Sequence, residues 1–160
     1  MSPPRKGGAN GWMFNPSRDQ VRDLFFEAWR KYRAGEPLAG IESLALEAAL
    51  LHPEYHPVLD DAVRYRAREY LPELGETNPF LHLSLHLALE EQLSIDQPHG
   101  IAAAFALLLA RRAHQHNARH EAAHEAIECL GEMVWRSQRD RAAPDAASYL
   151  DCVRRCAGAQ

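Results

Sequence analysis

The sequence is poor in cysteine, has no long hydrophobic run and carries no excess of positive charge. Its three cysteines, Cys129, Cys152 and Cys156, are too few and too unevenly spaced for a disulfide framework, and an odd number is typical of a reducing compartment. The longest strongly apolar run, residues 101–110, reaches about half of the roughly 20 residues that a membrane-spanning helix needs. The formal net charge is -4 with neutral histidines. We therefore expect neither a membrane nor a nucleic acid as a partner.

Length and composition predict one compact domain. A chain of 160 residues is close to the commonest domain size, and 46% apolar with 25% charged residues is ordinary for a globular protein. Residues 1–12 are rich in Pro and Gly, and their basic residues are not followed by the apolar stretch of a secretory signal. We expect a flexible tail at 1–12, a single helical domain at 13–156, a short tail at 157–160 and a cytoplasmic location.

Apolar residues recur at helical spacing along most of the chain, which predicts an all-α fold, a compact bundle of about six to seven helices. Asn15 and Pro16 resemble a cap and first turn, as do Asn78 and Pro79. The predicted helices span about 15–35, 38–51, 53–70, 79–93, 101–112, 117–139 and 145–156. The leucines of 81–89 alternate as in a strand, but the cap and the high content of Leu, Ala, Glu and Gln favour a helix there.

Two helices carry the same pattern of possible metal ligands, His-x3-His-x3-Glu, which we call the two ladders. The ladders consist of His82, His86 and Glu90 on the first helix and of His120, His124 and Glu128 on the second. Residues four apart on a helix are separated by about 6 Å along the axis and share one face, so neighbouring rungs can bind one ion. Rungs eight apart are about 12 Å from each other, too far for a shared ion with bonds of about 2 Å.

Apolar residues share the face of each ladder, so we expect the rungs to point into the bundle. Buried carboxylates are costly unless they are paired, and a divalent cation held with imidazoles would pair them. The alternative is that these are ordinary surface or core histidines of a chain that has nine. Further candidates lie in the segment HPEYH, where His52, Glu54 and His56 are close together and His56 could add a ligand from a third helix.

Other histidines and motifs point to weaker hypotheses. His99, His114 and His116 lie in or beside turns and are expected to be solvated. The string HEAAH at 120–124 matches the pattern in which two histidines bind zinc and a glutamate, here Glu121, activates water, but no edge strand for a peptide substrate is apparent. Cys152 and Cys156 are one helical turn apart, and without a second such pair the sequence favours no metal or redox role for them.

Several long segments resemble one known family. They are MFNPSRDQVR, HPEYH, NPFLHLSLHLALEEQLSIDQP and HEAAHEAIECLGEMVW. Through them, residues 13 to about 155 resemble the uncharacterised bacterial proteins grouped as domain of unknown function 1841. The resemblance implies a bacterial cytoplasmic protein and brings no activity with it.

The sequence thus predicts a helical bundle that binds one or two divalent transition-metal ions. The expected core ligands are His82, His86, His120 and His124, completed by Glu90, Glu128 and His56. Mixed imidazole and carboxylate ligands suit iron or zinc, with manganese as a further candidate. One alternative is a metal-free interaction or structural module with a protein partner or a second copy, for which one of the adjacent Phe25 and Phe26 would be exposed. A second alternative is a zinc hydrolase that uses HEAAH.

Overall fold

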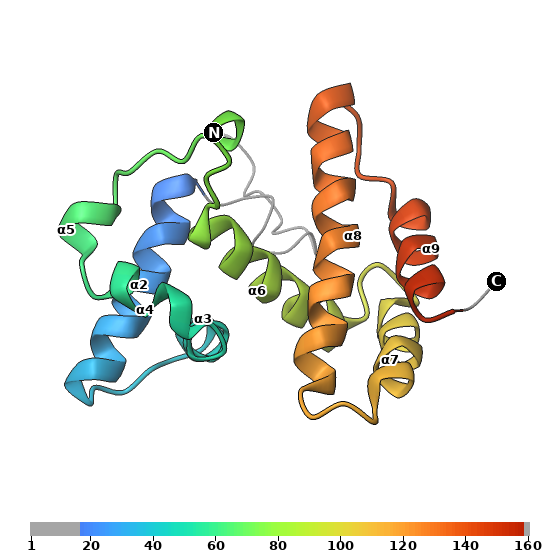
Figure 1. Ribbon diagram of the computed structural model, residues 1–160, viewed down its shortest axis with the longest axis horizontal. Coiled ribbons are helices and arrows are strands. Elements are labelled where there is room, and N and C mark those ends of the chain that lie inside the picture. Colours follow the sequence, from blue (N-terminus) through green and yellow to red (C-terminus); the bar gives the residue numbers. More distant parts are fainter. Residues whose placement is uncertain (1–16, 159–160) are drawn as a thin grey trace, which may run out of the picture. The chain divides into compact units, whose positions relative to one another are not determined.

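The computed structural model describes residues 17–158, in which every regular element is a helix and no strand occurs, so the predicted all-α class is confirmed (Figure 1). The predicted tail at 1–12 and the cap at Asn15 lie outside the described residues. The chain divides into two compact units, with the boundary between Leu87 and Ala88. We call residues 17–87 the N-terminal unit and residues 88–158 the C-terminal unit. The expectation of a single domain stays a prediction.

The N-terminal unit begins with α2 (Arg18–Ala34), which packs on α3 (Ile41–Leu50). The Ser17 hydroxyl accepts a hydrogen bond from the backbone N–H of Gln20, and the Gln20 side chain accepts one from the backbone N–H of Ser17. This reciprocal capping fixes the start of the helix. Gly35 ends it with a φ of 69°, a left-handed conformation that glycine adopts without strain.

The helix predicted at 53–70 is wrong, because the chain forms only short pieces there. They are the 3₁₀ turn η1 (Pro53–Tyr55), α4 (His56–Leu59), α5 (Ala62–Tyr65) and the 3₁₀ turn η2 (Pro72–Leu74). The Asp61 carboxylate caps the restart at α5 by accepting from the backbone N–H of Arg64. Beyond α5 the buried guanidinium of Arg22 donates to the carbonyls of Arg66 and Arg68, at 2.9 and 2.6 Å, and so replaces helical hydrogen bonds.

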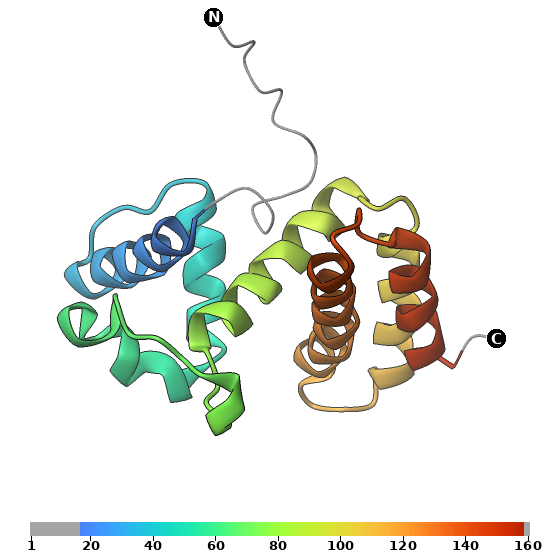
Figure 2. The same ribbon diagram turned by 90° about the horizontal axis from the view of Figure 1, so that it is seen from above.

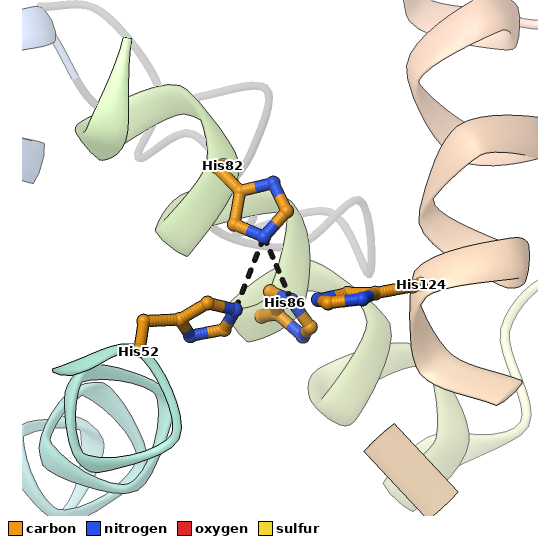
Figure 3. Close-up of side chains that lie close together, drawn as sticks. All are labelled: His52, His82, His86 and His124. Atoms are coloured by element: carbon orange, nitrogen blue, oxygen red, sulfur yellow. Dashed lines mark hydrogen bonds between the residues drawn. The ribbon is translucent and has the colours of Figure 1, made fainter. Parts of the chain in front are cut away.

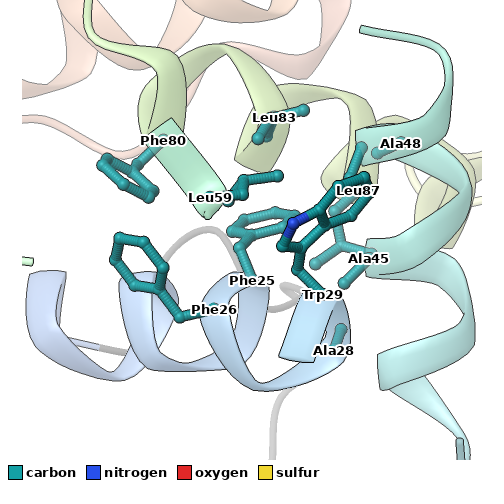
Figure 4. Packing of buried hydrophobic residues seen from close by; sticks show 11 residues of the cluster. Phe25, Phe26, Ala28, Trp29, Ala45, Ala48, Leu59, Phe80, Leu83 and Leu87 are labelled. Atoms are coloured by element: carbon teal, nitrogen blue, oxygen red, sulfur yellow. The ribbon is translucent and has the colours of Figure 1, made fainter. Parts of the chain in front are cut away.

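The core of this unit lies between α2, α3, α4 and the first turns of α6 (Pro79–Ile95), as Figure 4 shows. Phe25 and Phe26 are both buried in it, so the expectation that one of them is exposed is wrong. Helices contact α2 on more than one side, and the ring of Phe26 lies 5.2 Å from that of Phe80 on α6. Two adjacent residues, about 100° apart around a helix, can therefore both be buried.

Helix α6 confirms the helical assignment of the alternating leucines. The Asn78 side chain accepts hydrogen bonds from the backbone N–H groups of Phe80 and Leu81, as the predicted cap requires. Leu83 and Leu87, one turn apart, are fully buried in the core of the N-terminal unit. The first ladder lies one residue away from these leucines along the helix, which places His82 and His86 at the edge of this core.

The C-terminal unit contains the end of α6 together with α7 (Ile101–Arg112), α8 (Ala118–Asp140) and α9 (Ala146–Cys156), of which the last three pack on one another (Figure 2). Cys129 on α8 and Cys152 on α9 form a disulfide, which corrects the expectation of unpaired cysteines. Their separation of 23 residues along the chain hid this pairing. Among the helices of residues 17–158, none has the length and apolar character to cross a membrane.

Candidate metal centre

Three imidazoles of the N-terminal unit meet at one point (Figure 3). His82 and His86 are one turn apart on α6, and His52 lies between the end of α3 and Pro53. The Nε2 atom of His82 is 3.1 Å from Nε2 of His52 and 3.2 Å from Nε2 of His86. The same kind of atom from each ring therefore faces a common centre, as in a set of metal ligands.

The spacing of these nitrogens can be compared with that around a real ion. Zinc bound by histidine has Zn–N distances of about 2.0–2.1 Å, which in a tetrahedron places neighbouring nitrogens about 3.3–3.4 Å apart. The two observed separations, 3.1 and 3.2 Å, are within about 0.3 Å of that value. An ion could therefore enter with only small rotations of the rings.

A backbone carbonyl fixes the orientation of His52. Its Nδ1 is 2.7 Å from the carbonyl oxygen of Ala48, one turn earlier in the chain. Because a carbonyl can only accept, Nδ1 carries the hydrogen, and Nε2 of a neutral His52 presents its lone pair to the other rings. Histidines that bind metals are commonly held in this way through their second nitrogen.

Neutral rings can place only a limited number of hydrogens between these three nitrogens. Nε2 of His82 takes part in both short contacts. A neutral ring has a single N–H, so the one hydrogen on His82 Nε2 would have to be shared between His52 and His86 in a three-centre bond. A cation at the centre replaces this shared hydrogen by three separate bonds to lone pairs.

The cluster is also largely shielded from water. His52 is 1% exposed and His86 5%, and His82 is half-buried. The ring of Tyr55 stacks on His52 at 5.7 Å and meets His82 edge-on at 5.9 Å. Burial, with a smaller effect of the Glu54 charge, raises the pKa of the Tyr55 phenol above its ordinary value. Such shielding strengthens the interaction between a cation and its ligands.

His56, a predicted ligand, does not join this group. Its Nε2 is 2.8 Å from the carbonyl of Ala49, to which it must donate, and its ring packs on Trp29 with a centroid distance of 4.4 Å. Of the two histidines of HPEYH, it is thus His52 that faces the ladder of α6. From the sequence, His52 was predicted only as a further candidate close to His56.

The remaining rungs belong to the C-terminal unit. The imidazoles of His120 and His124 lie side by side on α8, with centroids 4.1 Å apart. Glu90 forms a two-pronged ion pair with Arg119, at 2.6 and 2.9 Å. Glu128 is exposed, so the expectation that it points inward is wrong. His124 is also drawn in Figure 3; that it and His120 share an ion with the first ladder stays a prediction.

The other histidine motifs are placed as follows. His99 is 96% exposed in its side chain, and His114 and His116 are exposed as well, as predicted. The Glu121 carboxylate of HEAAH accepts a hydrogen bond from the Asn117 side chain at 3.1 Å, near the start of α8. A hydrolase function for this motif stays a prediction.

The fold and the cluster define an all-α protein with a candidate metal centre made of imidazoles. The chain belongs to the family described as a domain of unknown function, DUF1841, whose sequence model matches residues 17–155 and so confirms the resemblance. A comparison with curated proteins finds no match, and a comparison with solved structures finds none either.

Proposed function

We propose that this protein binds a divalent transition-metal ion through His52, His82 and His86. The observation that carries the proposal is the meeting of three Nε2 atoms at 3.1 and 3.2 Å in a shielded place. The contact of His52 Nδ1 with the Ala48 carbonyl supports it, because it turns the other nitrogen toward the centre. We further propose a cytoplasmic location, which the sequence predicts, and a bacterial origin, which the family resemblance implies.

The ligand types favour zinc. Imidazole suits zinc, copper, iron and nickel, whereas manganese prefers oxygen ligands and non-haem iron commonly needs a carboxylate beside two histidines. The carboxylate of the first ladder, Glu90, is already engaged by Arg119. We therefore place zinc ahead of iron and manganese for the three-histidine centre.

A centre with only three protein ligands could have a catalytic role as well as a structural one. A tetrahedral zinc ion with three histidines has a fourth position for water or another ligand, and zinc lowers the pKa of bound water to about 7. His82 is the half-buried member of the three ligands, whereas His52 and His86 are buried. Metal-activated water is the reaction class that this arrangement suits.

Elemental analysis of untagged protein tests the proposal. Wild-type protein from zinc-replete and iron-supplemented media should carry stoichiometric metal, with zinc in preference to iron, and His82→Ala and His86→Ala should each lose it. His99→Ala is the matched control, because it also removes one imidazole, but from an exposed site outside the cluster. Circular dichroism of each variant establishes that the helices are retained.

Two further variants separate the ligand sets. His56→Ala should keep its metal, because that ring is bonded to the Ala49 carbonyl. His124→Ala tests the prediction that the second ladder shares the ion: loss of metal would support the sharing, and retention would limit the centre to the N-terminal unit. Metal-free wild-type protein from both media would refute the metal function and favour the interaction module.

A further inference from the structure

All three cysteines of the chain lie together in the C-terminal unit, although the sequence favours no role for them. Cys129 on α8 is bonded to Cys152 on α9, and Sγ of Cys156, one turn further along α9, is 4.0 Å from Sγ of Cys129. All three sulfur atoms lie within 4.8 Å of one another. The cluster is therefore triangular, with one edge closed by a covalent bond.

The size of this triangle matches a metal–thiolate site. Zinc–sulfur bonds of about 2.3 Å place the sulfurs about 3.8 Å apart in a tetrahedron and about 4.0 Å apart in a trigonal plane. The Sγ atoms of Cys129 and Cys156 are already 4.0 Å apart, which is the trigonal value. The Cα atoms of Cys129 and Cys152 are 5.8 Å apart, so their sulfurs can move to a similar separation by side-chain rotation once the bond between them is opened.

We propose that reduction of the Cys129–Cys152 disulfide creates a second metal site, in which Cys129, Cys152 and Cys156 bind one thiophilic d¹⁰ cation. Three thiolates are soft ligands, which suit Cu⁺ or Zn²⁺ and contrast with the imidazoles of the N-terminal unit. Cu⁺ would be held by the sulfurs alone, whereas Zn²⁺ would add a water molecule as its fourth ligand. The disulfide is the form of the site that cannot hold an ion.

The switch between the two forms balances as a two-electron reaction. A phosphine reductant and one water molecule open the disulfide, giving two thiols and the phosphine oxide, and the cation then displaces the thiol protons. In the reverse direction glutathione disulfide takes two electrons from Cys129 and Cys152, its own S–S bond breaks, and it leaves as two thiolates. The cation is released because only the Cys156 sulfur remains as a ligand.

A cavity gives the required access. Cys129 is only 4% exposed, but Cys129 and Cys152 both line a cavity of about 640 Å³ beside α8 and α9, together with Trp135 and Tyr149. Cys156 is partly exposed at the end of α9. A small reductant or a metal complex can thus reach the sulfurs without unfolding the unit.

Cadmium titration tests the site, because Cd²⁺ bound to thiolates has a sulfur-to-metal charge-transfer band that imidazole ligation lacks. Phosphine-reduced protein, kept free of oxygen, should develop this band up to one Cd²⁺ per chain, and the disulfide form should not. Competition by Zn²⁺ and by Cu⁺ in separate arms then ranks the natural candidates. His86→Ala should keep the whole band, so failure of the histidine centre is distinguishable from failure of this one.

Cys156→Ser is the decisive variant, because it removes one thiolate and leaves the disulfide pair intact. Circular dichroism establishes that this variant keeps its helices, and the mass of the oxidised protein shows the disulfide by the absence of two hydrogen atoms. We expect Cd²⁺ affinity to fall by more than about tenfold, since loss of a residue that merely orients a ligand already costs roughly 10–100-fold. An unchanged band and affinity in Cys156→Ser, or no band in the reduced wild type, would overturn the proposal.

Discussion

Zinc should raise the melting temperature of the metal-free protein, and His82→Ala should abolish this response. An ion that binds the folded state alone stabilises it by mass action. His82 is the residue to change because its Nε2 makes both short contacts, so its removal leaves His52 and His86 as a pair of rings with centroids 4.5 Å apart. A pair of imidazoles offers too few ligands for a tight zinc site.

The size of the effect follows from linkage. At a free zinc concentration 100 times the Kd, binding adds about 2.7 kcal/mol to the free energy of unfolding. For chains of this length each kcal/mol shifts the melting temperature by about 2–4 °C, so the expected rise is roughly 5–11 °C. His82 is only half-buried, so truncation itself should cost the metal-free protein about 1 kcal/mol.

The assay is differential scanning calorimetry of chelator-treated protein, with free zinc set by a nitrilotriacetate buffer. Wild type, His82→Ala and the exposed-site control His99→Ala are compared with and without zinc. A wild-type melting temperature that zinc leaves unchanged, or the same rise in His82→Ala as in the wild type, would refute zinc binding at the three histidines.

Two predictions concern residues outside the cluster. Arg22→Met should lower the free energy of unfolding in urea by about 2–4 kcal/mol, because it leaves the carbonyls of Arg66 and Arg68 without their charged donor; a loss below about 1 kcal/mol would contradict this. Hydrogen bonds from the backbone of Ala102, and secondly Gly100, lower the pKa of Asp96. Its charge therefore stabilises the fold above the ordinary carboxyl pKa of about 3.9, and this contribution is lost as pH falls through the lowered value. Asp96→Asn keeps the accepting oxygen but removes the charge. The difference in the free energy of unfolding in urea between the wild type and Asp96→Asn should therefore shrink as the pH is lowered from 7 to 3. A difference that stays constant over this range would contradict a contribution from the charge.

Helices with local start and stop signals were predictable from sequence. Residues 101–112 were predicted as a helix and form α7 (Ile101–Arg112), while α8 (Ala118–Asp140) and α9 (Ala146–Cys156) begin and end within one or two residues of the prediction. Gly100 precedes α7, and the Asp145 side chain caps the start of α9 by accepting from the backbone N–H of Ser148, and both signals are readable along the chain next to an apolar period.

The broken segment after α3 was not predictable in the same way. Its apolar residues allow a helix, but the Arg22 guanidinium holds the carbonyls of Arg66 and Arg68, which are 44 and 46 residues away. A hydrogen bond over such a distance leaves no period in the sequence. The disulfide between Cys129 and Cys152 was missed for the same reason, since it needs α8 and α9 to be neighbours.

Among the candidate ligands too, those related by local spacing were predictable, and those brought in from another segment were not. His82 and His86 were found because one helix places them on one face, and a spacing of four residues suffices to predict this. His52 has no partner at helical spacing in the sequence. It lies beyond the end of α3, and the contact of its Nδ1 with the Ala48 carbonyl turns its ring toward α6. The repetition of the glutamates was not a reliable sign that they bind metal. A carboxylate one turn beyond a histidine is equally able to pair with an arginine, as Glu90 does with Arg119. This difference changes the chemistry, since a centre of imidazoles without a carboxylate favours zinc over manganese or iron.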